Sequence, residues 1–146
     1  MPNGTDTSFL KIYGGWGDVA QSIVRELSRV LKGIDLSLDF VPLSTQDRRY
    51  AVVGRDGSAL NPQPDSQTQP IRLEEQAGIR KPLHLKVSLL PKADVGSWRQ
   101  RVAQAGFEMR TRTTPAHRDR VTFNVRTANE VAKDVRLFDE LFRACI

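Results

Sequence analysis

Short segments in which apolar and polar residues alternate recur along this chain and predict β-strands. Successive side chains of a strand point to opposite faces, so strict alternation is typical of a strand with one buried and one solvated face. The alternation is clearest at 34–40, 83–89 and 120–126. Three further strands are predicted at 9–13, 50–53 and 107–113.

Apolar residues spaced three and four positions apart predict helices at 18–32, at 94–105 and after Thr127. Asp18 is the expected N-cap of the first helix, with Gln21 in the third position of a capping box, and Gly33 is its expected C-terminal glycine. Thr127 and Glu130 predict a second capping box, at the start of the last helix.

Residues 58–82 differ in character, because prolines are interleaved with Gln, Ser and Asp. Proline lacks the N–H that helices and inner strands need, so an irregular internal loop is predicted across most of this stretch. Two shorter connections are also predicted: a turn at 54–57 and a hairpin loop at 115–119.

The predicted order is strand, helix, strand, strand on each side of the loop, followed by one last helix. This order indicates an α+β protein with two βαββ-like halves, and alternating strands favour an antiparallel or mixed sheet with about three helices packed on one face. A length of 146 residues fits a single domain spanning 1–146.

Composition narrows the class of protein further. With 39% hydrophobic and 27% charged residues the balance is that of a globular protein. No apolar run approaches the roughly 18 residues that span a bilayer, so no membrane partner is expected. The first residues lack the layout of a signal peptide, and Cys145 is the single cysteine, so a reducing, cytoplasmic compartment is expected.

The net charge of +5 lies entirely in the second half of the chain, where residues 74–146 hold fourteen Lys and Arg against nine Asp and Glu. The polar positions of three predicted strands place several of these cations on one sheet face, together with an amide: Lys86, Arg110, Arg112, Arg120, Arg126 and Asn124. Arginine forks suit phosphate or carboxylate groups. The leading hypothesis is therefore a noncatalytic interaction or regulatory module that binds an acidic protein or a nucleic acid, and an ordinary solvated sheet face is the alternative reading.

A glycine-rich segment supports a second hypothesis. Residues 15–20 read Gly-Trp-Gly-Asp-Val-Ala, between a predicted strand and a predicted helix. This resembles the dinucleotide-binding fingerprint, which implies that Gly15 and Gly17 bring backbone N–H groups to a phosphate and that Asp39 lies where a ribose would bind. A tight turn before a helix is the structural alternative, and Asp18 would repel a phosphate there.

No catalytic constellation can be read from the sequence. His84 and His117 are the two histidines, and neither lies in a recognisable metal or nucleophile motif. Asp35 and Asp39 share a predicted strand face, but they would lie about 13 Å apart, too far for most paired-carboxylate chemistry. No catalytic residue, metal or cofactor is therefore assigned. An oligomeric structural protein that pairs through an unpaired strand or the last helix is the third hypothesis.

Overall fold

The computed structural model describes residues 17–44, 49–61, 69–78, 81–109 and 120–146. These residues form four helices, namely α2 (Asp18–Ile34), α3 (Val95–Gln104), α4 (Ala128–Lys133) and α5 (Val135–Cys145). They also form seven strands, namely β1 (Leu38–Ser44), β2 (Arg49–Arg55), β3 (Ser58–Ala59), β4 (Ile71–Gly78), β5 (Lys81–Leu89), β6 (Glu108–Met109) and β7 (Val121–Val125).

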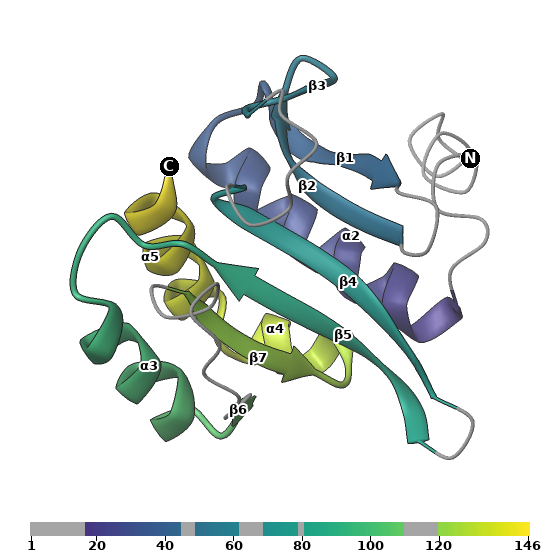
Figure 1. Ribbon diagram of the computed structural model, residues 1–146, viewed down its shortest axis with the longest axis vertical. Coiled ribbons are helices and arrows are strands. Elements are labelled where there is room, and N and C mark those ends of the chain that lie inside the picture. The colour runs from purple at the N-terminus through teal and green to yellow at the C-terminus, as the bar shows by residue number, and fades with distance from the viewer. Residues whose placement is uncertain (1–16, 45–48, 62–68, 79–80, 110–119) are drawn as a thin grey trace.

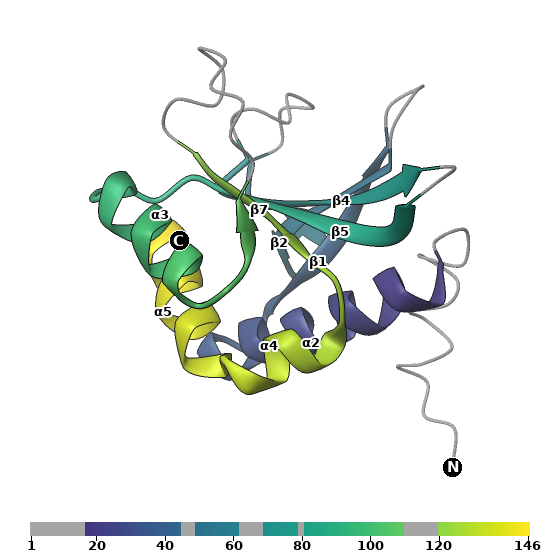
Figure 2. The same cartoon turned by 90° about the horizontal axis from the view of Figure 1, so that it is seen from below.

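All seven strands belong to one antiparallel sheet with the order β1-β2-β4-β5-β7-β6, and β3 pairs with β2. Helices α2, α4 and α5 lie along one side of this sheet, and α3 lies beside β7 and α5 (Figures 1 and 2). The α+β class, the antiparallel sheet and the packing of the helices on one face are therefore confirmed.

The core lies between the sheet and the helices. Leu85, Val87 and Leu89 of β5 alternate into it and are fully buried. Phe138 of α5 packs edge-on against Phe107, with ring centroids 5.5 Å apart. Burying side chains of this size stabilises the fold by about 1.5–3 kcal/mol each. The face of the sheet that carries β5's alternate residues, Lys86 and Ser88, is thereby turned away from the helices.

The largest departure from the sequence prediction is β4, which lies inside the segment 58–82 that was expected to be irregular. The prediction of an irregular loop is wrong for 71–78, for the short strand β3 and for 81–82, which begin β5. Ile71 and Leu73 point into the core, and Pro70 stands just before the strand, where its missing N–H disturbs no ladder bond. Strand β4 pairs with both β2 and β5, so it lies in the interior of the sheet.

The first helix and its flanks differ in detail from the prediction. The N-cap is Gly17 rather than Asp18, and no side chain caps this end. Gly33 lies inside the helix, which continues to Ile34, and β1 begins only at Leu38. The apolar residues 34 and 36 continued the alternation of the strand in sequence, which placed its predicted start too early.

The other predicted elements are confirmed where the structure describes them. The capping box is present, since Thr127 Oγ1 accepts the Glu130 N–H (3.3 Å) and the Glu130 carboxylate accepts the Thr127 N–H (3.0 Å). The last helical segment is divided at Asp134 into α4 and α5. The predicted strand at 9–13 and the hairpin loop at 115–119 lie outside the described residues.

Candidate functional site: a polar face on the sheet

The strands align polar side chains in two rows across the face that lies opposite the helices. The first row runs across five strands through Tyr50, Glu74, Lys86, Asn124 and Glu108. The second row runs across four strands through Val52, Arg72, Ser88 and Thr122. The polar residues of the two rows, which are all of them except Val52, together with Arg120 and Arg126 at the two ends of β7, are called the polar face below.

Charged groups of the first row form ion pairs with their neighbours. Lys86 Nζ lies 3.5 Å from Glu74 Oε1 across the β4–β5 pair, with the two side chains only 12% and 10% exposed. At the other end of the row, Asn124 Nδ2 donates to Glu108 Oε1 (2.8 Å) and Arg126 Nη2 contacts Glu108 Oε2 (2.6 Å). Glu74 lies opposite Lys86 and Glu108 lies opposite Asn124 on adjacent strands, so these side chains meet directly across the sheet, while Arg126 reaches Glu108 from just beyond the end of β7.

Arg120 joins the second row to the neighbouring helix. Its Nε donates to Ser88 Oγ (2.7 Å) and its Nη2 to the Ser88 carbonyl (3.0 Å), while the Ser88 and Thr122 hydroxyls lie 3.1 Å apart. The Arg120 carbonyl in turn accepts two hydrogen bonds from the Arg99 guanidinium of α3 (3.1 and 2.8 Å). This network fixes the end of β7 to both β5 and α3.

The structure brings together part of the residue set expected from the sequence. Strands β5 and β7 pair, so Lys86, Asn124 and Arg120 share a face, with Arg126 at its border. The expectation that these cations point into water is wrong for two of them, because Arg120 is 2% exposed and Lys86 is largely buried beside Glu74. Arg126 is exposed. The remaining two residues of the set, Arg110 and Arg112, lie outside the described residues.

Sequence reasoning missed Arg72 and Glu74, because they lie in the segment that was taken as irregular. Both are buried on the polar face, and the Arg72 guanidinium carbon lies 5.4 Å from the centroid of the Tyr50 ring. The signal that could have revealed them is the short alternation Ile71, Arg72, Leu73, Glu74 directly after Pro70.

Gly17 of the glycine-rich segment forms a hydrogen bond with a carboxylate. The Gly17 N–H, at the N-terminal end of α2, donates to Glu75 Oε2 of β4 (2.5 Å). A carboxylate therefore already lies where the fingerprint would place a phosphate, and Asp18 adds a second negative charge in the first turn. The strand that follows α2 is the antiparallel edge strand β1 rather than a parallel neighbour. Gly15 lies outside the described residues, and the nucleotide hypothesis gains no support from those that are described.

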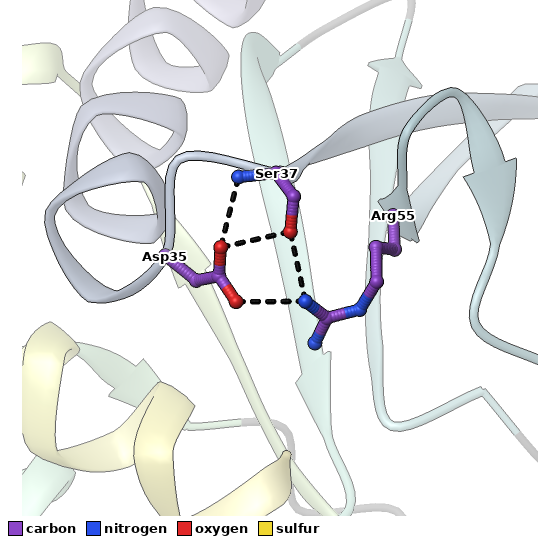
Figure 3. Close-up of polar contacts among 3 residues, drawn as sticks. All are labelled: Asp35, Ser37 and Arg55. Carbon is purple, nitrogen blue, oxygen red and sulfur yellow. Dashed lines mark hydrogen bonds and ion pairs between the residues drawn. The ribbon is translucent and has the colours of Figure 1, made fainter.

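A second polar cluster lies at the turn between α2 and β1 (Figure 3). Asp35 Oδ1 accepts the Ser37 N–H (2.9 Å) and the Ser37 hydroxyl (2.8 Å), and Asp35 Oδ2 pairs with Arg55 Nη1 (2.7 Å). These contacts, chiefly the Ser37 N–H and then Arg55, lower the pKa of Asp35 to about 2.

Asp39 is held separately by its own partners. It accepts hydrogen bonds from the Ser28 hydroxyl (2.9 Å) and the Phe40 N–H (2.8 Å), and it pairs with Lys32 (3.4 Å). The two aspartates thus have separate structural partners.

The surroundings of Cys145 disfavour its ionised form. Burial raises the pKa of the Cys145 thiol to about 12, so the thiolate needed for nucleophilic attack is scarce near neutral pH. Within the described part of the chain, no three His, Cys, Asp or Glu side chains come together as a group able to hold a metal ion. The His84 side chain and the whole of His117 lie outside that part.

The described residues define an α+β protein with an antiparallel sheet whose face opposite the helices carries ordered, mostly buried polar side chains. No protein-family model, no curated protein and no solved structure matches this chain. Each helix in the described ranges is too short or too polar to cross a membrane.

Proposed function

We propose that this protein is a noncatalytic interaction module that binds an acidic macromolecule through the polar face. The observation that carries this proposal is the distribution of charge. The described residues hold sixteen Lys and Arg against thirteen Asp and Glu, a net +3. The polar face holds four of these cations against Glu74 and Glu108, a net +2. Most of the net positive charge of the described chain is therefore gathered on one face.

An excess of positive charge on one face attracts anions over several ångströms and increases their rate of encounter. The backbone register places Arg72 of β4 and Lys86 of β5 on this face, and Arg120 and Arg126 flank the two ends of β7. Arg126, at the solvent-exposed border of the face, is the cation that an approaching partner meets first.

Arg126 has a closely matched control in Arg143. Arg126 pairs with Glu108 at 2.6 Å and its side chain is 56% exposed, while Arg143 of α5 pairs with Asp139 at 2.7 Å and its side chain is 55% exposed. Arg126→Glu and Arg143→Glu make the same change in net charge in similar surroundings. They differ in their place, since the first lies on the polar face and the second in the helix layer.

Binding of fluorescent poly-L-glutamate and of oligouridylate should be measured for both variants at low and moderate salt. We expect Arg126→Glu to weaken binding of the preferred polyanion by about threefold or more and to reduce its salt dependence, with Arg143→Glu close to the parent. An equal loss in both variants would show that net charge alone acts and would contradict the role of the polar face. A parent protein that binds neither probe would contradict the proposed function.

A further inference from the structure

Helix α3 buries little of its length. Of its ten residues only Val102 is fully buried, whereas five of the eleven residues of α5 are buried. Val95 and Trp98 pack against the core and are partly exposed. The helix lies at the border of the helix layer, beside β7 and α5 (Figures 1 and 2). Because most of the stability of a helix in a protein comes from the apolar face that it buries, α3 is held more weakly than α2 or α5.

Two arginines of α3 bind neighbouring elements. Arg99 donates from Nε and Nη2 to the carbonyl of Arg120, just before β7 (3.1 and 2.8 Å). Arg101 pairs with Glu140 of α5 at 3.2 Å, and these side chains are 43% and 40% exposed. An exposed ion pair is screened by water and contributes little, whereas hydrogen bonds from a charged donor to the carbonyl of a buried residue contribute more. The Arg99 bonds are therefore the stronger polar attachment.

A residue with left-handed backbone conformation lies at each end of α3. Asp94, the N-cap, has φ 60° and ψ 40°, and its side chain caps no N–H of the helix. Gly106, two residues after the helix, has φ 96°. The left-handed conformation is disfavoured for Asp94, which carries a Cβ, while glycine adopts either sign of φ with little cost. The backbone can therefore change direction at both ends of α3 without losing a favoured conformation.

The chain is anchored just outside these two residues. On one side, the Lys92 N–H donates to the carbonyl of Ala144 near the end of α5 (2.9 Å). On the other side, the Phe107 ring is buried and lies 5.5 Å from the Phe138 ring, centroid to centroid. The weakly held segment therefore has sharp limits and comprises residues 93–106.

From these observations we propose that residues 93–106 open and close as one unit while the sheet and the other helices stay folded. Helix α3 turns away from the core at its two left-handed ends, which breaks the bonds from Arg99 and exposes Trp98 and Val102 together with the core surface that they cover. Local openings of this kind occur in elements with few buried apolar contacts. They are less costly than complete unfolding, because α2, α5 and the sheet keep their contacts.

Amide hydrogen exchange followed by NMR tests this opening in the parent protein. After correction for intrinsic rates, we expect the hydrogen-bonded amides of α3, such as that of Trp98, to exchange at least about tenfold faster than the slowest amides of α2. Low concentrations of urea should change the α3 rates little, since a local opening exposes little surface, and should speed the slowest α2 amides strongly. Amides of α3 with the same rates and the same urea dependence as those of α2 would overturn the proposal.

A substitution outside the segment separates local opening from complete unfolding. Ile23→Val removes one methyl group from the buried face of α2, away from α3 (Figure 1). It should speed the slowest α2 amides by about two- to tenfold and leave the α3 rates unchanged, because the contacts of Ile23 survive the opening. An equal increase in the α3 rates would show that α3 opens only when the whole protein unfolds.

A matched pair of variants inside the segment tests what holds it closed. Arg99→Met and Arg101→Met each remove a guanidinium, but the first loses the bonds to the Arg120 carbonyl and the second loses an exposed ion pair. The contact of Arg101 with the Trp98 ring lies within α3 and survives the opening. We expect Arg99→Met to speed α3 exchange by about tenfold or more and Arg101→Met by about threefold or less. Equal effects would overturn the role of Arg99.

Discussion

At the scale of single residues, Asp35 shows how one side chain fixes a connection between two elements. Its carboxylate binds the backbone and the hydroxyl of Ser37, and it pairs with Arg55 on the neighbouring strand (Figure 3). The Asp35 carbonyl also accepts the Leu38 N–H (3.0 Å). The turn from α2 into β1 is thus held by contacts to the charged form of this carboxyl group. The stability of the turn therefore depends on pH.

We expect Asp35 to contribute to an acid-dependent loss of stability. Its folded pKa of about 2 lies below the ordinary value of 3.8, so its stabilising effect is complete above about pH 4 and is lost as the pH falls through about 2. Urea unfolding of the parent and of Asp35→Asn from pH 2 to pH 7 measures this effect. The two curves should converge toward pH 2, and Arg55→Met should raise the pKa of Asp35 seen by NMR. A difference in the free energy of unfolding between the two proteins that stays constant from pH 2 to pH 7 would contradict the role of the charged Asp35.

At the scale of elements, the hairpin between β2 and β3 depends on two glycines for different reasons. Asp56 and Gly57 both have positive φ, 52° and 85°, as in the two-residue turns that match the twist of a hairpin. Gly54 lies inside β2, where an added Cβ would come within 2.6 Å of the Ser58 carbonyl oxygen. The first requirement concerns the backbone conformation of the turn, and the second concerns the close approach of two strands.

Alanine substitutions at Gly54 in β2 and at Gly33 in α2 should have opposite effects on stability. Gly54→Ala forces the β2–β3 backbone apart and should destabilise the protein by about 1–3 kcal/mol. Gly33→Ala lies in α2, where a Cβ would meet nothing within 4 Å, and should stabilise it by about 0.5–1 kcal/mol through helix propensity. Chemical denaturation measures both free energies of unfolding. Similar effects at the two positions would show that the space around Gly54 does not matter.

At the scale of the whole molecule, β1 lies at one end of the order of the described strands, and its outer edge determines whether the sheet can extend into a second copy. The Leu38 and Phe40 N–H groups, which point away from β2, already donate to the Asp35 carbonyl and to Asp39 Oδ1. Pro42, the next position of the same orientation, has no N–H. Occupied donors and proline are known protections of edge strands. This edge therefore gives little support to the hypothesis of an oligomer formed through an unpaired β1.

Removing these protections should promote association. The double variant Asp39→Ala, Pro42→Thr exposes the Phe40 N–H and adds a donor two residues later, so we expect a larger, concentration-dependent mass than that of the parent. Light scattering measures the mass, and circular dichroism confirms that the variant is folded. Pro42→Thr alone, which leaves Asp39 on the Phe40 N–H, serves as the control. A double variant with the parent's mass at every concentration would show that the edge is not protected in this way.

The sequence by itself determined the α+β class, most helices and strands, and the capping box at Thr127. It also placed Lys86, Asn124 and Arg120 on one sheet face. These features follow from periodicity and from contacts within a few residues, which a single sequence displays directly. The sequence did not predict strand β4, because this strand shows only two alternating apolar positions, Ile71 and Leu73, in a segment dominated by proline and glutamine.

Only the tertiary structure decided what surrounds each charged group. The position of β4 beside β5 sets Glu74 against Lys86, and the approach of β4 to the start of α2 sets Glu75 on the Gly17 N–H. The burial of Arg120 against Ser88 likewise depends on residues 32 positions apart. Such contacts follow from the order and register of strands, which periodicity does not encode, so sequence could indicate the cations of this face but not their partners or their exposure.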